Sequence, residues 1–407
     1  MIDYNVYAKL VLSKCVNLQP QEDLLINAPI EAIDFVDALV LAAYKDFKSG
    51  TVHINWQAPT LSKYKINYGS EKVLGDVPNY VLSRYDTMIK RNAAVINLTS
   101  NMASAMKDID PRKMKQASEL SAPKVRPFDQ KMFQELKWSL IPFPSMAWAK
   151  RTYPKLSETE AAEKLKEAFD YMMHLDEKNP AKAWEVQLET IEKRRDLLNQ
   201  KAYKMLRFRS KHTQLDLPLA ENHTWTGGRE YHANGSFVRQ LPDYKISTAP
   251  HKFGASGTVR FTTPLNVRGQ FLKPFTLQFE DGKIIQILSD QKNVVEKLFG
   301  VDEGASYVGK VTLIGDESPI KHLKTFFYMG LIDLNFGSSI ALGHADPRML
   351  QGGTKLNRTG LEEAGLNQSR IHVEGIFASP DMKVYGVLED DEEELIMEKN
   401  AFVGAFV

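Results

Sequence analysis

The N-terminal segment alternates strand, helix and strand, and this order constrains the fold more than any other feature of the sequence. Residues 24–27 form a short apolar run, residues 30–47 carry apolar side chains at helical spacing, and residues 51–56 are rich in strand formers. Gly50 ends the helix before the second strand. Two strands joined through a covering helix run parallel. The sequence therefore predicts a parallel sheet covered by helices, with a further strand at residues 94–98.

The pattern changes twice further along the chain. Residues 111–210 are mostly helical: Ser157 and Glu160 have the spacing of a capping box, and Asn179 stands before a proline that suits a first helical position. From residue 212 onward, short alternating strands follow, and Asp281-Gly282 between two of them is a hairpin signal. The second half is therefore expected to be rich in β-structure.

A chain of 407 residues is too long for one typical core, which favours two domains. We predict an α/β and α+β fold. Residues 1–110 would form a three-layer α/β domain with a parallel sheet, and residues 111–210 a helical segment that packs on or links the domains. Residues 211–407 would form a mixed, β-rich C-terminal domain.

Composition excludes several classes of function. The formal net charge of +1 gives no electrostatic reason to bind nucleic acid or an anionic membrane. No apolar run approaches the roughly 20 residues of a membrane span, and the N-terminus lacks a signal-peptide pattern. Cys15 is the single cysteine, so the chain has no internal disulfide or cysteine-based zinc site. We expect a cytoplasmic protein without nucleic-acid or membrane partners.

A series of short strings runs in a fixed order through the second half. These are LDLP at 215–218, ENHTW at 221–225, TAPHK at 248–252, FEDGK at 279–283, DEGA at 302–305, ALG at 341–343, GGTK at 352–355 and HV at 372–373. In this order and spacing, the chain resembles the aminopeptidase T/aminopeptidase S (PepS-like, leucyl aminopeptidase) metallopeptidase family over nearly its whole length. The AWAK string at 147–150 also fits.

The resemblance implies a homodimer of exopeptidases that release N-terminal residues. In the family, two zinc or cobalt ions polarise the scissile carbonyl and generate the attacking hydroxide, and the sites face an internal cavity. The resemblance also implies the fold of the thermophilic metallopeptidase-like aminopeptidases.

Most positions that the resemblance assigns to the metal pair carry other residues. Tyr244 and Lys245 stand at the family's Glu-Glu pair, Lys310 at a ligand glutamate, Ser339 at a ligand histidine, Asp346 at a tyrosine thought to assist catalysis, and His372-Val373-Glu374 at the family's His-x-Asp. Exchanging two glutamates for two lysines changes the charge of the site by about four units. Such a site repels a dication by several kcal/mol even at an effective dielectric of about 20.

We therefore predict that the two-metal centre is largely lost and that no cofactor is bound. Lys245 and Lys310 would stand where the metals stood, paired with Glu374 and Asp346, and these four residues are the catalytic candidates. The lysines would hold a substrate carboxylate or act as general bases. The ligand would be a small peptide or an amino-acid-like compound. The candidates for binding it are Tyr244, Ser339, His223, His251 and His344.

Three alternatives remain open. His344-Ala345-Asp346 and His372-Val373-Glu374 are both H-x-[DE], and such pairs share one face of a strand, so His372 and Glu374 would help to bind one zinc or iron ion. A ring-cleaving dioxygenase branch of this fold uses a comparable triad. A second alternative is an active aminopeptidase in which Asp243 and Glu303 replace lost ligands. The third is a binding or scaffold protein without chemistry.

Overall fold

The computed structural model describes residues 2–100, 109–267 and 270–407, and their contacts divide the chain into two compact units. The first consists of Met1–Val186, Arg229–Pro242 and Phe326–Leu331, and the second of Gln187–Gly228, Asp243–Thr325 and Ile332–Val407. The boundary falls within the long helix α9 (Pro180–Lys201). The three sequence ranges expected above stay a prediction.

The first unit is built on a parallel sheet. Its four strands are β1 (Leu24–Pro29), β2 (Val52–Gln57), β3 (Ala94–Thr99) and β4 (Trp138–Pro142), in the order β2-β1-β3-β4. Every neighbouring pair is parallel. The predicted parallel sheet and its strands at 24–27, 51–56 and 94–98 are therefore confirmed.

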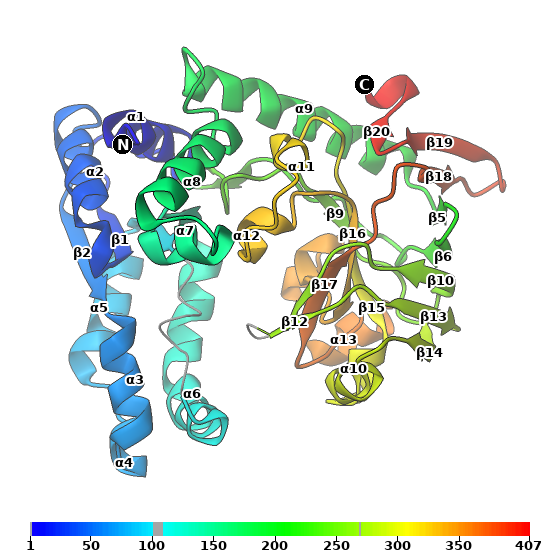
Figure 1. Ribbon diagram of the computed structural model, residues 1–407, viewed down its shortest axis with the longest axis horizontal. Helices are drawn as coiled ribbons and strands as arrows, with labels where there is room; N and C mark the ends of the chain where they lie inside the picture. Colours follow the sequence, from blue (N-terminus) through cyan, green and yellow to red (C-terminus); the bar gives the residue numbers. More distant parts are fainter. Residues whose placement is uncertain (1, 101–108, 268–269) are drawn as a thin grey trace. The chain divides into compact units, whose positions relative to one another are not determined.

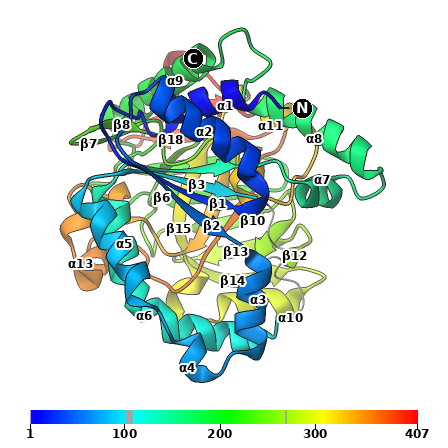
Figure 2. The same cartoon turned by 90° about the vertical axis from the view of Figure 1, so that its left-hand side faces the viewer.

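Helices cover both faces of this sheet, which makes three layers (Figure 1). On one side lie α1 (Tyr4–Leu10) and α2 (Ile33–Lys45), where the rings of Tyr7 and Phe35 stack with centroids 4.5 Å apart. On the other side lie α5 (Asn79–Lys90) and α6 (Pro111–Glu135) (Figure 2). Further helices of this unit are α3 (Pro59–Tyr68), α4 (Glu71–Leu74), α7 (Met146–Thr152) and α8 (Glu158–Met172).

Local capping signals in the sequence place the helix starts correctly. Helix α8 begins with a reciprocal capping box: the Ser157 hydroxyl accepts a hydrogen bond from the Glu160 backbone N–H, and the Glu160 carboxylate accepts one from the Ser157 backbone N–H. The Asn179 side chain accepts a hydrogen bond from the Lys182 amide at 3.1 Å, ahead of Pro180. No helix in the part of the chain that the structure describes is long and apolar enough to span a bilayer.

The second unit combines two antiparallel sheets. The larger has the order β14-β13-β10-β6-β5-β18-β19-β20 and the smaller the order β17-β16-β15-β9. The strands of the larger sheet are β5 (Met205–Arg209), β6 (Gln214–Pro218), β10 (Ser256–Arg260), β13 (Thr276–Glu280), β14 (Lys283–Leu288), β18 (Lys383–Val387), β19 (Glu393–Glu398) and β20 (Ala401–Phe402). The predicted hairpin is present: Asp281 and Gly282, with φ of 47° and 81°, join β13 to β14.

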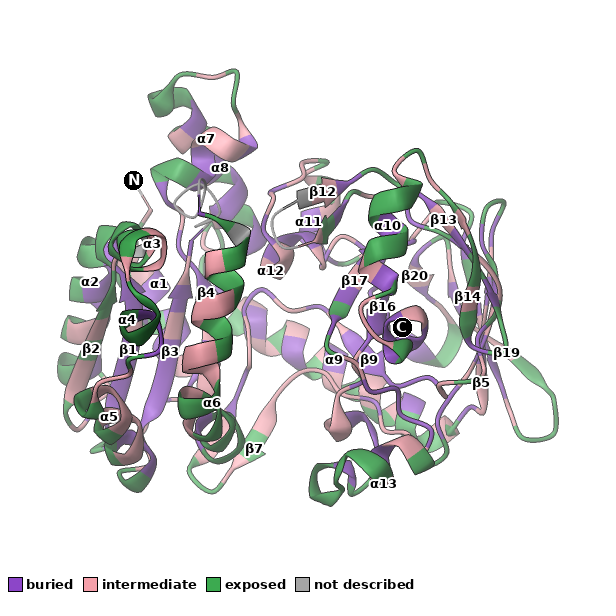
Figure 3. Ribbon diagram, turned by 90° about the horizontal axis from the view of Figure 1, so that it is seen from below, coloured by how far each residue is buried: buried purple, intermediate pink, exposed green. Residues whose placement is uncertain are grey.

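The smaller sheet has one apolar face and one polar face. Its strands are β9 (Ile246–Thr248), β15 (Val308–Leu313), β16 (Ser339–Gly343) and β17 (His372–Ile376). Val311, Ile340 and Val373 belong to the core cluster shared with the larger sheet. All five residues of β16 are buried (Figure 3). Because side chains alternate along a strand, the intervening residues turn to the opposite face, and that face carries the predicted site.

Smaller elements complete the two units. These are β7 (Glu230–His232), β8 (Gly235–Phe237), β11 (Leu265–Val267), β12 (Gln270–Leu272), α10 (Lys292–Phe299), α11 (Pro319–His322), α12 (Gly330–Asp333) and α13 (Arg358–Glu363).

Candidate functional site

Glu374 is the centre of the polar face of the smaller sheet. Its side chain is only 6% exposed, and the Lys310 ammonium lies 2.6 Å from its Oε2 atom. Its Oε1 atom accepts hydrogen bonds from the Ser339 hydroxyl at 2.6 Å and the Thr312 hydroxyl at 3.3 Å. Strand β15 thus contributes two groups, Lys310 and Thr312, and β16 contributes Ser339, so both oxygens of the β17 carboxylate are satisfied.

The register of the sheet explains why Lys310 reaches Glu374. Both residues pair with Ala341 of the central strand, Lys310 from one side and Glu374 from the other. They are therefore two strand spacings apart, about 10 Å, and the small Ala341 side chain leaves the space above it open. Two long side chains meet there.

A β-bulge at Gly309 places the Lys310 side chain on the polar face of the sheet. Val308 pairs with Leu342 on the apolar face, whereas Lys310 pairs with Ala341 on the polar face, so the register shifts between them. Without the bulge, residues 308 and 310 would share a face. A Cβ atom at Gly309 would lie 2.1 Å from the Gly343 carbonyl oxygen, so the close approach of β15 and β16 requires glycine.

The ion pair fixes the charge of the carboxylate. Burial by itself raises the pKa of Glu374, but the Lys310 charge, together with the hydrogen bonds from Lys310 and Ser339, outweighs burial and lowers the pKa to about 2. Glu374 is therefore anionic at neutral pH. A carboxylate with so low a pKa is a weak proton acceptor, so its role in this arrangement is to hold the lysine.

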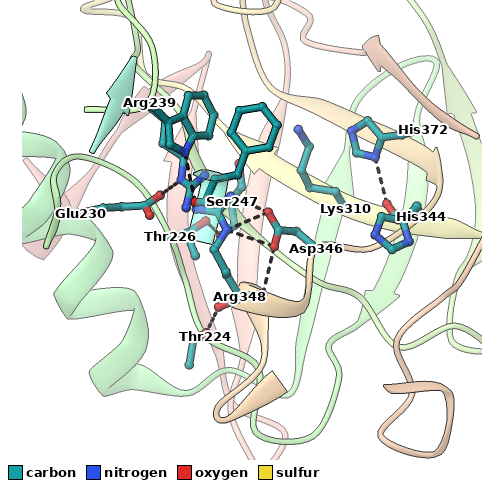
Figure 4. Close-up of polar contacts among 12 residues, drawn as sticks. Thr224, Thr226, Glu230, Arg239, Ser247, Lys310, His344, Asp346, Arg348 and His372 are labelled. Carbon is teal, nitrogen blue, oxygen red and sulfur yellow. Dashed lines mark hydrogen bonds and ion pairs between the residues drawn. The ribbon is translucent and has the colours of Figure 1, made fainter. Parts of the chain in front are cut away.

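His372 stands two residues from Glu374 on β17. Its Nδ1 atom is 2.9 Å from the His344 carbonyl oxygen (Figure 4), which places the ring proton on Nδ1, and Nε2 lies 4.0 Å from Glu374 Oε2. Burial and the Lys310 charge lower the pKa of His372, against the weaker effects of the His344 carbonyl and Glu374. The imidazole is therefore neutral at pH 7, with an unprotonated Nε2 available to accept a proton.

Lys245 and Asp346 have other ion-pair partners in the structure than the predicted ones. Lys245 pairs with Asp243, two residues earlier, at 3.1 Å. Asp346 caps the 3-10 turn Pro347–Met349 and pairs with Arg348 at 2.5 Å (Figure 4). Lys245 and Asp346 each pair with a residue two positions away in the sequence, because a turn brings such neighbours together at little cost in chain entropy. Of the two lysines, Lys310 is the one bonded to Glu374.

The binding candidates outside this group lie in other surroundings. Tyr244 is buried at 1% exposure, and its amide donates to the Asn335 side chain at 2.9 Å. His223 Nδ1 contacts the Ala220 carbonyl at 3.0 Å, and burial lowers the pKa of this histidine. His251 packs against Gly365, where any Cβ would lie 2.3 Å from the ring. Burial also lowers the pKa of His344. Their roles in ligand binding stay predictions.

Sequence reasoning missed two members of the network. Thr312 bonds Glu374, and its hydroxyl lies 2.8 Å from that of Ser247 on β9. The signal was present, because Thr312 follows Lys310 at the two-residue period of a strand. The partner from β9 was visible only through the pairing of Thr312 with Ser247.

The donor set does not fit two metal ions. A catalytic zinc site takes three protein ligands and one open position. Here the Lys310 ammonium already binds the Glu374 carboxylate, and its positive charge repels a cation. Across residues 2–100, 109–267 and 270–407, no three histidine, cysteine, aspartate or glutamate side chains are grouped to hold a metal. The single-metal alternative assumed two strand pairs, but His344 and Asp346 follow the end of β16 at Gly343 and are not a pair on a strand face.

The fold and this sheet identify the class of protein. The family model of the thermophilic metalloproteases (M29) matches residues 3–402, and the chain belongs to that family. The resemblance drawn from the ordered strings is confirmed.

The relatives within this class are aminopeptidases. The chain is 30% identical to Aminopeptidase 2 of Geobacillus stearothermophilus, with 96% of this chain and 95% of the relative covered. It is also 30% identical to Aminopeptidase T of Thermus aquaticus, with 98% of each covered.

Two solved structures share the fold. Wild-type AmpT from Thermus thermophilus superposes with a TM-score of 0.90 at 27% identity, over 98% of this chain and 99% of that chain. The 2,5-dihydroxypyridine dioxygenase of Pseudomonas putida KT2440 has a TM-score of 0.51 at 13% identity, over 98% of this chain and 96% of that chain, which indicates a common fold alone.

Proposed function

We propose that this chain is an aminopeptidase-family protein that binds or converts a peptide or amino-acid-like compound without the family's two-metal centre. The observation that carries the proposal is the buried contact of 2.6 Å between Lys310 and Glu374, with an ammonium at a position where the resemblance implies a ligand carboxylate. The Lys310 charge neutralises Glu374, the carboxylate that stands at the aspartate of the family's His-x-Asp.

The arrangement supports recognition of an anionic group. A lysine ammonium has three N–H donors, and among the described residues Lys310 spends one on Glu374. The remaining donors suit the carboxylate of a peptide or amino acid. The neutral Nε2 atom of His372 supplies a proton acceptor beside them. Lys310 and His372 are the catalytic or binding groups in this proposal, and Glu374 positions the lysine.

Metal analysis tests the central claim. The protein is dialysed against a weak chelator and its zinc, cobalt and iron content is measured per chain. We expect less than one equivalent of metal. Two tightly bound zinc or cobalt ions per chain would refute the proposal.

Ligand binding tests the lysine. Leucine and the dipeptide Leu-Leu are titrated into the wild-type protein and into Lys310→Met, Lys310→Arg and Lys383→Met. Lys310→Met should weaken binding about tenfold or more, because a charged hydrogen bond is worth about 1.5–3 kcal/mol, and Lys310→Arg should restore part of it. Lys383 forms an exposed pair with Glu398 and is the matched control. Equal affinity in all four proteins would remove Lys310 from the site.

The names of the relatives favour a second candidate function. Aminopeptidase 2 and Aminopeptidase T are similar over almost the full chain, which supports a metal-dependent aminopeptidase with a remodelled site. Hydrolysis of a chromogenic leucine amide with added Zn²⁺ or Co²⁺ separates the candidates. Turnover that is lost in His372→Ala would establish the aminopeptidase, whereas the absence of turnover supports the metal-free proposal.

The quaternary state and location also belong to this proposal. The resemblance supports a homodimer, and the single cysteine supports a cytoplasmic location. Size-exclusion chromatography with light scattering is expected to give twice the chain mass of 46.1 kDa.

A further inference from the structure

A ladder of asparagines crosses the parallel sheet of the first unit. Asn27 of β1 is in register with Asn55 of β2 and with Asn97 of β3. The Asn55 amide donates to Asn27 Oδ1 at 2.8 Å, and the Asn27 amide donates to Asn97 Oδ1 at 2.9 Å. Asparagine is depleted in strands, and strands of a covered parallel sheet are normally apolar. Three in one row therefore call for an explanation beyond packing.

The ladder has a direction. Arg84 of α5 donates to Asn55 Oδ1 at 2.8 Å, so each side-chain amide accepts a hydrogen bond on its oxygen and donates one from its NH₂ group to the next residue. In this order, Oδ1 of Asn97 accepts the hydrogen bond from Asn27, and the NH₂ group of Asn97 is the last donor of the row. Among the described residues, that NH₂ has no hydrogen-bond acceptor. The sheet therefore ends this row with a donor.

The ladder opens into a cavity of about 70 Å³ under α5 and α6. Arg84, Asn27 and Asn97 line it, and Asp129 of α6 lines it as well. Leu25 and Val95, two residues before the asparagines on the same strand faces, form its apolar floor. The cavity thus has apolar walls and a few convergent polar groups, which is the usual composition of a small-molecule site.

Opposite charges line this cavity without neutralising each other. Neither Arg84 nor Asp129 forms an ion pair within the described ranges. The Tyr85 hydroxyl bonds the Asp129 carboxyl, yet burial outweighs that bond and raises the pKa of Asp129. A half-buried carboxyl in this state gains from an added cation or donor, and the remaining N–H groups of Arg84 gain from an added anion.

We infer that this cavity binds a small zwitterion, a free amino acid with a short side chain. The ligand carboxylate would face Arg84 and its ammonium would face Asp129, while the Asn97 amide donates to a ligand oxygen. A water-sized group needs about 15 Å³ of such space, so the cavity holds about five, which is close to the number of non-hydrogen atoms in glycine or alanine. Leucine is too large.

Ligand-observed NMR on the full-length chain tests the inference. Glycine and L-alanine should bind at millimolar concentration, whereas N-acetylglycine, glycinamide and L-leucine should not bind in this cavity, because each lacks one charge or exceeds the space. Absence of binding by both glycine and alanine would overturn the inference, and the cavity would then contain solvent only.

Variants assign the binding to this cavity. Asp129→Asn keeps the size of the side chain and its acceptor for Tyr85, and should weaken glycine binding about tenfold or more. Arg84→Gln should do the same, which covers the case that one variant folds poorly. Asp86→Asn is the matched control on α5, since Asp86 is 45% exposed and pairs with Lys90. Circular dichroism checks that each variant folds.

The Lys310→Met variant separates this site from the one proposed above. Once circular dichroism shows that Lys310→Met is folded under the assay conditions, the glycine binding that depends on Asp129 should persist in this variant. If binding is lost in Lys310→Met and kept in Asp129→Asn, the amino acid occupies the site around Glu374 and the inference is wrong. Failure of the Glu374 proposal leaves this result unaffected, because the two sites share no residue.

Discussion

Replacing Lys310 by methionine should destabilise the second unit strongly. The substitution keeps the length of the side chain but leaves Glu374 buried without its cation. The pKa of Glu374 falls from its ordinary value of 4.5 to about 2 in the native state, which corresponds to about 3 kcal/mol at 1.36 kcal/mol per pKa unit. Measured losses on breaking one side of a buried ion pair are about 3–5 kcal/mol. We expect a loss in this range at pH 7.

The pH dependence should also reverse in sign. In the wild type the folded-state pKa of Glu374 is depressed, so its contribution to stability is complete above pH 4.5 and is lost as the pH falls toward 2. In Lys310→Met, only the Ser339 hydrogen bond and the weaker effect of His372 still oppose burial, so we expect the pKa of Glu374 to rise above its unfolded value. The carboxyl then stabilises the fold only while protonated, so the variant should lose stability as the pH rises above 4.5.

Urea denaturation followed by circular dichroism measures both effects at pH 5 and pH 8. Lys383→Met removes an exposed pair, at 45% and 39% exposure, and should cost less than about 1 kcal/mol. The double variant Lys310→Met/Glu374→Gln should recover most of the loss, because no buried charge remains. A free energy of unfolding for Lys310→Met within about 1 kcal/mol of the wild type at pH 8 would refute the reasoning.

Three further outcomes follow from the structure. Gly309→Ala should cost more than about 2 kcal/mol and disrupt the bulge, since its Cβ would meet the Gly343 carbonyl oxygen at 2.1 Å; thermal unfolding measures it against Gly330→Ala, where a Cβ meets no atom within 4 Å and the backbone has no positive φ. NMR titration should place the pKa of His372 below its ordinary value of 6.5, and Lys310→Met should raise it by removing a nearby positive charge; an unchanged value would contradict the proximity of the two groups. Ser157→Ala should lower stability by about 1 kcal/mol through loss of the capping box, as measured by urea denaturation of the first unit.

Local patterns in the sequence predicted three of the four strands of the first unit's sheet, whereas β4 lies within a range that was expected to be mostly helical. Helix starts at Ser157 and Asn179 depend on side chains within three residues, so the sequence alone places them. Strand and helix in alternation predict a parallel sheet because a covering helix leaves few other connections. The order of short strings predicts the family, and the family model over residues 3–402 confirms it.

The sequence also identified the residues at the altered ligand positions, but not which of them meet. Lys245 and Lys310 look equivalent in the sequence, yet Lys245 pairs with Asp243 and Lys310 with Glu374. The difference comes from the bulge at Gly309, which turns one lysine to the polar face of the sheet. A bulge shifts the two-residue period by one, and the amino-acid pattern of a single strand contains no record of that shift.

The asparagine ladder shows the same division between sequence and tertiary structure. Alternation along each strand predicts that Asn27 and Leu25 share a face, and this holds for Asn97 and Val95 as well. The strand order β2-β1-β3 then brings three asparagines from distant parts of the chain into one row. The amino-acid pattern was enough to predict most of the elements, their faces and the family. Which side chains become partners could be seen only in the fold, because hydrogen bonds across a sheet depend on register and strand order, and both are set by packing of the whole unit.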